Sequence, residues 1–318
     1  MRIFYNVNEI PRDPNTILTI GTFDGLHLGH QEIIKKLLER SNFHKGRNLL
    51  ITFHPHPRKI VQGLNEQKIL STLEEKSEIL EKLGIDNLLV IKFTKEFSLQ
   101  SPTEFIRDFI IKKIGLKEIV VGYDHKFGKS REGNHETLKV LGQNLGFYIT
   151  IVDEFKINNE VVNSTKIRNA LMNGNIKQAN AFLGRPYSFT GIVVEGDKRG
   201  RLLGYPTANI KINDEDRLLP ALGIYAAEVS IDKDKHIGLL SVGQRPTFYE
   251  NGDIVPEVYI YDFDSSIYNK KITVSIIEKI RGEEKFSSPE KLINQMNKDR
   301  EAGLKIFEEL NILKNKIN

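Results

Sequence analysis

The first half of the chain alternates short apolar runs with longer segments in which apolar residues recur every three or four positions. The short runs lie at residues 17–20, 49–53, 88–93, 119–121 and 148–152. The segments with helical spacing lie at residues 31–40, 72–83, 102–114 and 135–145. Strands separated by helices of this length are typical of a parallel sheet. The pattern therefore predicts a doubly wound, Rossmann-like α/β domain.

From about residue 183 onward, strand-like stretches are separated mostly by turns instead of helices. They lie at residues 188–195, 223–231, 235–242, 255–261 and 271–279. This arrangement predicts an antiparallel β-barrel. Ser288 and Pro289 then open a terminal helix that runs to about Leu310. The change of pattern predicts two domains, residues 1–182 and residues 183–318.

Composition supports two folded domains and excludes several classes of protein. A chain of 318 residues exceeds what one hydrophobic core usually supports. The surplus of 46 Lys and Arg over 42 Asp and Glu is small and dispersed, so no nucleic-acid partner is expected. No cysteine occurs, so any metal must bind oxygen or imidazole. No run of about 18 apolar residues and no secretory signal occurs, so we expect a cytoplasmic protein without a membrane partner.

Residues 21–30, which read GTFDGLHLGH, have the composition of a phosphate-binding turn. A glycine after a strand lets the backbone approach a ligand closely, and a helix starting near Leu28 directs its unpaired N–H groups at the same place. His27 and His30 are three residues apart, so both side chains can donate to phosphate oxygens from one side of the helix start. A turn with two incidental histidines is the alternative for this motif.

A second segment, residues 196–209, combines glycines with basic residues. Gly196, Gly200 and Gly204 with Arg199 and Arg201 form a flexible, basic loop suited to a triphosphate. Thr207 and Asn209 add two neutral oxygens, which are suitable ligands for Mg²⁺ already bound to phosphates. A simple turn leading into a strand is the alternative.

Three further segments of the first half carry polar groups with more than one interpretation. Residues 52–57 (TFHPHP) fit a turn that lines a ligand pocket or a two-histidine metal site. Residues 122–131 contain Gly128-Lys129-Ser130, which superficially resembles the end of a P-loop. A P-loop also requires a glycine at position 123, which is Tyr here, so the P-loop interpretation fails. Ser164 and Thr165 precede a helical run and fit either a helix cap or a phosphate contact.

Together these segments resemble bacterial bifunctional riboflavin kinase/FAD synthetases. Residues 21–30 resemble the signature of the nucleotidyltransferase superfamily, and residues 52–57, 122–131 and 163–168 resemble the later motifs of the FAD synthetase module. Residues 206–209 (PTAN) resemble the motif of riboflavin kinases. Downstream segments follow in the order of that family, at residues 223–226, 243–248, 257–263 and 281–286. The resemblance extends from about residue 17 to about residue 300.

The resemblance implies a nucleotidyltransferase fold followed by a riboflavin-kinase barrel, with ATP as co-substrate and Mg²⁺ as cofactor. Catalytic roles are implied for Glu257, as the base of the kinase half, and for His27 and His30. Nucleotide or phosphate contacts are expected at Gly21, Phe23, Asp24, Gly29, Ser164, Thr165, Arg168, Gly196, Arg199, Gly200, Arg201 and Gly204. Flavin contacts are expected at His54, Pro55, His56, Pro57, Asp124, Phe127, Arg281 and Phe286. Thr207 and Asn209 are the expected metal ligands.

The expected activity is the phosphorylation of riboflavin to FMN by ATP, followed by adenylylation of FMN to FAD with release of pyrophosphate. ADP is the other product of the first step. Three alternatives remain: that one half alone is active, that the first half uses another phosphorylated acceptor, or that the chain is a flavin-binding regulatory protein without turnover. We expect a monomer or a weak homo-oligomer.

Overall fold

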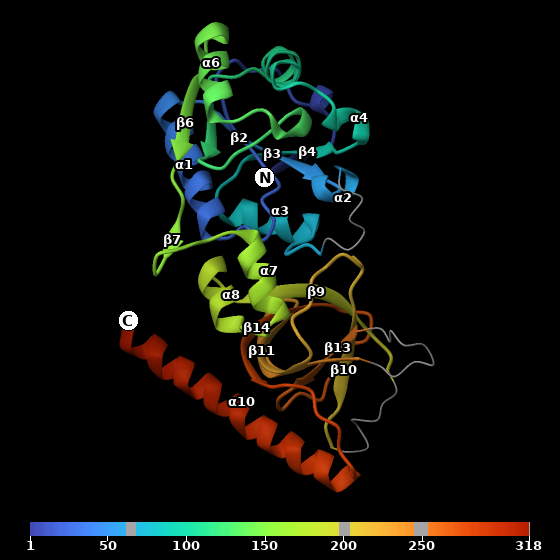
Figure 1. Ribbon diagram of the computed structural model, residues 1–318. Coiled ribbons are helices and arrows are strands. Elements are labelled where there is room, and N and C mark those ends of the chain that lie inside the picture. The colour runs from blue at the N-terminus through green and yellow to red at the C-terminus, as the bar shows by residue number, and fades with distance from the viewer. Residues whose placement is uncertain (62–67, 197–203, 245–253, 318) are drawn as a thin grey trace. The chain divides into compact units, whose positions relative to one another are not determined.

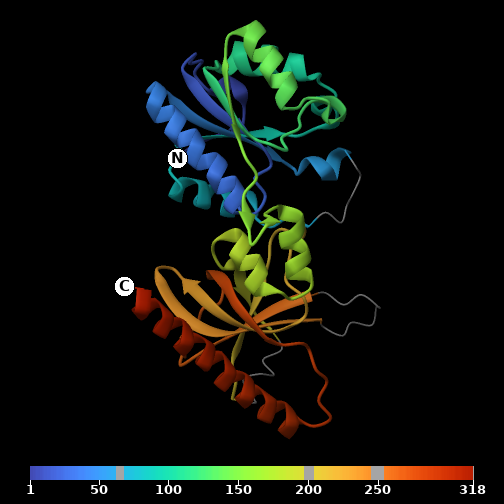
Figure 2. The ribbon, with the colours of Figure 1, turned by 60° about the vertical axis from the view of Figure 1, so that its left-hand side comes forward.

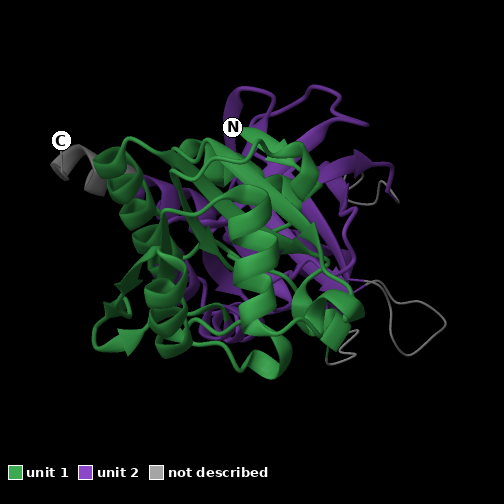
Figure 3. Ribbon diagram, turned by 90° about the horizontal axis from the view of Figure 1, so that it is seen from above, with its two compact units in different colours: residues 1–164 green, residues 165–318 purple. Residues whose placement is uncertain are grey.

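A computed structural model describes residues 1–61, 68–196, 204–244 and 254–317, with side chains up to residue 310. The chain divides into two compact units, Met1–Ser164 and Thr165–Asn318 (Figure 3). Each unit is described by itself.

Unit 1 contains a parallel sheet of six strands (Figure 1). Its strands are β1 (Arg2–Phe4), β2 (Thr16–Ile20), β3 (Arg47–His54), β4 (Asn87–Lys92), β5 (Glu118–Gly122) and β6 (Tyr148–Val152). They lie in the order β1-β4-β3-β2-β5-β6, and all five neighbouring pairs are parallel. The five predicted strands and the parallel sheet are confirmed. The short edge strand β1 was not predicted.

Helical segments connect these strands. They are η1 (Val7–Glu9), α1 (Leu28–His44), α2 (Pro57–Val61), α3 (Leu73–Lys82), α4 (Lys95–Ser98), α5 (Pro102–Glu104), η2 (Phe105–Ile114), η3 (Lys129–Arg131) and α6 (His135–Leu145), and a small hairpin of β7 (Lys156–Ile157) and β8 (Glu160–Val161) follows. The helix predicted at residues 102–114 begins as expected, with Ser101 and Glu104 forming a capping box around Pro102. It then continues as the π-helical segment η2.

The core of unit 1 lies in two layers, one on each face of the sheet. Successive strand residues alternate between the layers, as Leu88 and Leu89 on β4 do. Residues of α1 and α3 cover one face, and residues of η2 and α6 cover the other. Burial on both faces explains why the strands read as continuous apolar runs.

Unit 2 contains a closed antiparallel barrel with the strand order β10-β13-β12-β11-β14-β9. Its strands are β9 (Tyr187–Val194), β10 (Thr207–Lys211), β11 (Gly223–Ile231), β12 (Asp234–Gln244), β13 (Ile254–Ile260) and β14 (Lys271–Arg281). The predicted barrel and its five predicted strands are confirmed. The sixth strand, β10, carries the residues that the sequence assigned to a metal site or a turn.

Two helices precede the barrel, α7 (Ser164–Met172) and α8 (Ile176–Leu183). Asn180 ties α8 to the barrel: its Nδ2 donates to the carbonyl of Ile276 at 2.9 Å, and its Oδ1 accepts from the amide of Tyr187 at 2.7 Å. These helices therefore group with the barrel. The domain boundary between residues 182 and 183, which the sequence pattern predicts, stays a prediction.

The terminal helix α10 (Pro289–Ile317) packs along the outside of the barrel (Figure 2). Its Phe307 joins Leu239 and Tyr261 in an apolar cluster. Asp299 binds the guanidinium of Arg281 on β14 through both carboxylate oxygens, with Nε at 2.9 Å from Oδ1 and Nη2 at 2.8 Å from Oδ2. This bidentate pair, largely buried, ties α10 to the end of β14.

A polar cluster joins the amino-terminal ends of β5 and β6 to the last turns of α1. Glu118 is 1% exposed and accepts from Arg40 Nε at 2.8 Å, from Thr150 Oγ1 at 2.6 Å and from His44 Nε2 at 2.8 Å. Burial alone would raise the pKa of Glu118, but the hydrogen bonds from Arg40, Thr150 and His44 hold it below its ordinary value. The carboxylate is therefore ionised and fully paired.

We expect Glu118→Ala to lower the free energy of unfolding of unit 1 by about 3 kcal/mol, because it leaves the partly buried guanidinium of Arg40 without its carboxylate. Glu39→Ala, which removes an exposed pair with Lys36, should have a much smaller effect. Hydrogen exchange of unit 1 peptides at increasing urea measures both. Because the folded pKa of Glu118 lies below its unfolded value, its contribution should be present above pH 4.5 and disappear as the pH falls. Equal effects of the two substitutions would contradict this account.

Candidate functional site

The turn at residues 21–30, which the sequence predicts to bind phosphate, lies where the strand order of unit 1 reverses. From β2 the chain first builds outward through β3 and β4, and it then returns to the other side of β2 to form β5. Gly21 follows the carboxyl end of β2, and Tyr123 and Asp124 follow the carboxyl end of β5. In open α/β sheets ligands bind in the crevice at this reversal.

Buried contacts within unit 1 hold the turn between β2 and α1. Phe23 and Leu26 are buried and have left-handed backbone angles, with φ of 47° and 44°. Asp24 is 2% exposed, and its Oδ1 accepts from the amides of Leu70 at 2.9 Å and Ser71 at 3.2 Å. The side chain of Asp24 thus braces the turn against residues 70 and 71, and its contact with a nucleotide stays a prediction.

His27 and His30 lie together at the first turn of α1. Their rings stack with centroids 3.7 Å apart, and Nδ1 of His27 caps the helix by accepting from the amide of His30 at 3.4 Å. Nδ1 of His30 is buried and has no hydrogen-bond partner within the described part of the chain. Burial, followed by the charges of His27 and Lys76, lowers the pKa of His30 well below 6.5. His30 is therefore a neutral imidazole in the ligand-free protein.

Two glycines of the turn lie close to aromatic rings. A Cβ atom at Gly29 would lie 3.3 Å from Cε1 and Nδ1 of His27, and one at Gly21 would lie 3.0 Å from the ring of Phe23. Larger side chains at these positions would displace the rings. The absence of a side chain at Gly29 keeps the His27 ring in its stacked position.

Lys76 belongs to this group, although the sequence analysis did not identify it. It lies on α3 and is 7% exposed, and its Nζ donates to the carbonyl of Thr22 at 2.6 Å. Burial lowers the pKa of Lys76 to about 8, while the nearby carboxylate of Asp24 opposes this shift. The sequence signal was a lysine on the apolar side of the segment at residues 72–83, between Leu73 and Leu80.

Ser164, Thr165 and Arg168 lie on α7, whose first residue is Ser164. The hydroxyl of Ser164 donates to the carbonyl of Asp24 at 3.0 Å, which places it beside the phosphate turn within unit 1. Thr165 is the next residue, and Arg168 is buried one turn further along the helix. Their roles as phosphate ligands stay predictions.

The predicted flavin residues of unit 1 fall into two groups. His54 ends β3, and Pro57 is the first residue of α2, so Pro55 and His56 lie in the short connection between them. His56 Nδ1 accepts from the amide of Arg58 at 3.2 Å. Asp124 is exposed beyond β5.

The ring of Phe127 is 8% exposed and packs against Phe105, so most of it contributes to the core. Its neighbour His125 stacks on it with ring centroids 5.6 Å apart. Burial, followed by the charge of Arg131, lowers the pKa of His125 to about 4.

In unit 2 the register of β10 and β13 brings three predicted residues together. Asn209 lies directly opposite Glu257, and Thr207 lies opposite Tyr259. The hydroxyl of Thr207 donates to Oε2 of Glu257 at 3.1 Å. Directly paired residues share one face of a sheet. A carboxylate, a hydroxyl and a carboxamide from distant parts of the chain therefore lie on one face of the barrel.

The glycine-rich loop before β10 is described only at its ends. A Cβ atom at Gly196 would lie 2.1 Å from Nδ2 of Asn209, so the carboxamide occupies space that only glycine leaves open. Gly204 has a left-handed φ of 85°. Arg199, Gly200 and Arg201 lie outside the described residues.

Arg281 and Phe286, the predicted flavin residues of unit 2, lie together. The guanidinium carbon of Arg281 is 5.7 Å from the centre of the Phe286 ring, while its nitrogens bind Asp299. On the neighbouring surface, Tyr205 packs edge-on against Tyr259 with centroids 5.1 Å apart and donates its hydroxyl to Asn297 of α10. The helix α10 thus contributes polar groups beside the barrel face that carries Glu257.

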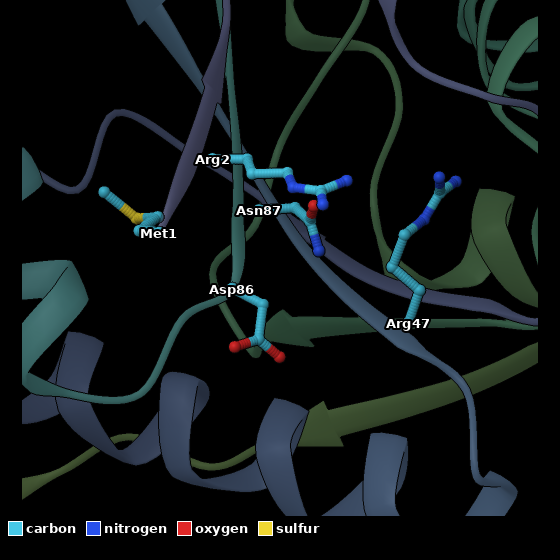
Figure 4. A pocket seen from close by; sticks show the side chains of 5 residues that line it. All are labelled: Met1, Arg2, Arg47, Asp86 and Asn87. Atoms are coloured by element: carbon cyan, nitrogen blue, oxygen red, sulfur yellow. The ribbon is translucent and has the colours of Figure 1, made fainter.

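One open pocket of about 450 Å³ lies elsewhere in unit 1 (Figure 4). Its lining residues are Met1, Arg2, Arg47, Asp86 and Asn87, which lie at the amino ends of β1, β3 and β4. The Arg47 guanidinium donates to the carbonyl of Pro11 at 2.7 Å and to Thr16 Oγ1 at 2.7 Å, which are structural contacts. Since ligands of such sheets bind at the carboxyl ends, this pocket is not the candidate site.

The fold and the two groups of residues define a protein with a nucleotidyltransferase-like α/β unit and a kinase-like closed barrel. The FAD synthetase family model matches residues 9–166, and the riboflavin kinase family model matches residues 183–307. The bifunctional riboflavin kinase/FMN adenylyltransferase of Listeria monocytogenes is 37% identical over 94% of each chain. That of Bacillus subtilis is 36% identical over 93% of each chain. The chain belongs to the family of bifunctional riboflavin kinase/FMN adenylyltransferases.

A solved structure also matches nearly the whole chain. The crystal structure of a Streptococcus pneumoniae protein, named as a macrolide-efflux protein, has a TM-score of 0.87 at 30% identity and covers 95% of this chain and 98% of its own. The efflux name differs from the names of the curated relatives, which agree with both family models. In the described part of this chain, no helix combines the length and apolarity needed to cross a bilayer.

The lowered pKa of His30 predicts that ATP binding takes up protons near pH 6.5. Without phosphates beside it His30 is a neutral imidazole, and the negative charge of bound phosphates is expected to raise the pKa of His30 towards the solution pH. Lys76, with a pKa of about 8, is already protonated there and contributes no uptake. Titration calorimetry in buffers of different ionisation enthalpy measures the uptake. His30→Ala should reduce it, whereas His135→Ala, on the exposed surface of α6, should not. An uptake that is unchanged in His30→Ala would contradict the assignment.

Proposed function

We propose that this chain makes FAD from riboflavin in two ATP-dependent steps, one in each domain. The kinase domain is assigned to residues 183–318 and the adenylyltransferase domain to residues 1–182. The observation that carries the proposal is the grouping of Thr207, Asn209 and Glu257 on one barrel face, in a chain that also places His27 and His30 at the reversal of a parallel sheet. We further propose a cytoplasmic protein that is a monomer or a weak homo-oligomer.

In the first step, the terminal ribityl hydroxyl of riboflavin attacks the γ-phosphorus of ATP, and ADP leaves. Glu257 accepts the proton of this hydroxyl as the new O–P bond forms. The hydrogen bond from Thr207 holds the carboxylate of Glu257 in place. Arg281 and Phe286 contribute to flavin binding on the same domain.

Magnesium enters with ATP as part of the substrate. The hydroxyl of Thr207 and the carboxamide oxygen of Asn209, which is 5% exposed, are hard neutral ligands suited to Mg²⁺ that phosphates already hold. Among the described residues, no cluster of three His, Asp or Glu side chains forms a metal cage. The proposed role of Thr207 and Asn209 is therefore to position a metal that the nucleotide brings.

In the second step, a phosphate oxygen of FMN attacks the α-phosphorus of another ATP, and pyrophosphate leaves. His27 and His30 donate to the phosphates, and Ser164, Thr165 and Arg168 complete the phosphate contacts from α7. Asp24 contributes by bracing the turn that carries both histidines. Residues 54–57 and Asp124 line the flavin side of the site, with the exposed part of Phe127.

Glu257→Gln should reduce FMN formation from riboflavin by about 10²–10⁴-fold, because the amide cannot accept the proton of the hydroxyl. FAD formation from added FMN should persist, since that reaction belongs to the other domain. Chromatography of flavins over time, with ATP and Mg²⁺, measures both. Glu228→Gln, which alters a surface pair with Lys235 on the same barrel, is the matched control. Loss of both reactions, or of neither, would contradict the role of Glu257.

His30→Ala should let FMN accumulate from riboflavin while FAD formation falls by about 10²–10³-fold, the effect of removing one donor from a transition state. The same chromatography measures this result, with His135→Ala as the control. Failure of the unaltered protein to convert either flavin, despite tight flavin binding, would instead favour a regulatory protein. Pyrophosphate release with a phosphorylated acceptor other than FMN would show that the second step uses another substrate.

A further inference from the structure

Lys76 lies at a position of α3 where an apolar side chain would be expected. It is three residues after Leu73 and four before Leu80, so all three lie on the side of the helix that packs on the sheet. Taking an ammonium out of water is costly unless its charge has partners. The burial of Lys76 therefore requires an explanation from its surroundings.

The hydrogen bonds of Lys76 join two segments that are 30 residues apart in the sequence. Its Nζ donates to the carbonyl of Thr22 at 2.6 Å and to Oγ1 of Thr52 at 3.4 Å. Oγ1 of Thr52 itself donates to the carbonyl of Thr22 at 3.2 Å. Thr22 begins the phosphate turn after Gly21, and Thr52 lies two residues before His54. The ammonium thus links the carboxyl ends of β2 and β3.

The charge of Lys76 acts on the groups that surround this link. Asp24 favours the charged ammonium, and the charge of Lys76 in turn disfavours protonation of His30. In the described part of the chain, Thr22 and Thr52 are the hydrogen-bond acceptors of Lys76. One of its three N–H donors is therefore left for another acceptor.

We propose that Lys76 is a positioning residue for nucleotidyl transfer: its ammonium holds the Thr22 carbonyl against the end of β3 and keeps a fixed positive charge beside the histidine pair. This inference rests on the proposed adenylyltransferase reaction. A charge that is held in place before the phosphates arrive stabilises negative charge without reorganisation during the reaction. It also disfavours protonation of His30 in the empty site, so that this histidine takes up its proton when the triphosphate binds.

Three variants and one control separate charge from packing. Lys76→Met removes the charge at similar volume, Lys76→Gln keeps a donor without charge, and Lys76→Arg keeps the charge. Lys82→Met, at the exposed end of the same helix, is the matched control. We expect the Met and Gln variants to lower kcat for FAD formation by about tenfold or more, and Arg to restore most of it. FMN formation, which belongs to the other domain, should stay unchanged, and hydrogen exchange of unit 1 peptides shows whether unit 1 is folded.

The pKa of His30, followed by NMR and assigned with His30→Ala, supplies the readout that packing alone would not move. It should rise in the Met and Gln variants and stay low in the Arg and Lys82→Met proteins. The role of Lys76 would be overturned if the three Lys76 variants and Lys82→Met all had the same kcat for FAD formation and the same pKa of His30. It would also be overturned if Lys76→Arg formed FAD no faster than Lys76→Gln. If Lys76→Met does not fold, the comparison of Gln with Arg decides. Absence of FAD formation in the unaltered protein would refute the proposed function itself.

Discussion

The reversal of strand order between β2 and β5 is the constraint on which the nucleotide site of unit 1 depends. Adjacent strands that are followed by connections running in opposite directions leave a crevice at their carboxyl ends. In the turn after β2, Phe23 and Leu26 adopt left-handed backbone angles, and the burial of both side chains compensates for that strain. Asp24 and Lys76 then fix the turn from either side, one by accepting amide hydrogens and the other by donating to a carbonyl. The histidine pair is therefore held by buried groups and not by the ligand.

In unit 2 the barrel brings together Thr207 and Glu257, which are 50 positions apart in the sequence. Strand register does this directly, because an antiparallel pairing places Asn209 opposite Glu257 and leaves Thr207 within hydrogen-bond distance of the same carboxylate. A shift of register by one residue would turn Glu257 to the other face. The buried residues of β13, which alternate with Glu257 and Tyr259, oppose such a shift. The packing of the core thus also fixes the geometry of the proposed base.

Sequence patterns predicted most of the fold, because alternation and helical spacing report burial directly. The bounds of α6 and β11 match those predicted, and the parallel sheet and closed barrel were expected. Strand β10 was harder to predict, since its five residues include the polar side chains of Thr207 and Asn209, which interrupt the alternation of apolar residues. The burial of Lys76 was not predicted, because a charged residue on an amphipathic helix normally lies in water. The packing of Phe127 against Phe105 is a contact that no local pattern reveals, and its contact with flavin stays a prediction.

Of the two proposed reactions, only the kinase reaction requires a group that accepts a proton. The carboxylates Glu257 in unit 2 and Asp24 in unit 1 have surroundings that agree with this difference. A ribityl alcohol is a weak nucleophile that loses a proton, so the kinase site requires a base. The proposed base, Glu257, accepts a hydrogen bond from the hydroxyl of Thr207 on the partly exposed face of β13. The phosphate of FMN, with a second pKa of about 6, is already an anion near neutral pH and needs no base. In keeping with this, the carboxylate of Asp24 accepts from the backbone amides of residues 70 and 71, and nearby Lys76 is an ammonium that donates to the carbonyl of Thr22. The adenylyltransferase site is thus suited to neutralising charge, whereas the kinase site is suited to removing a proton.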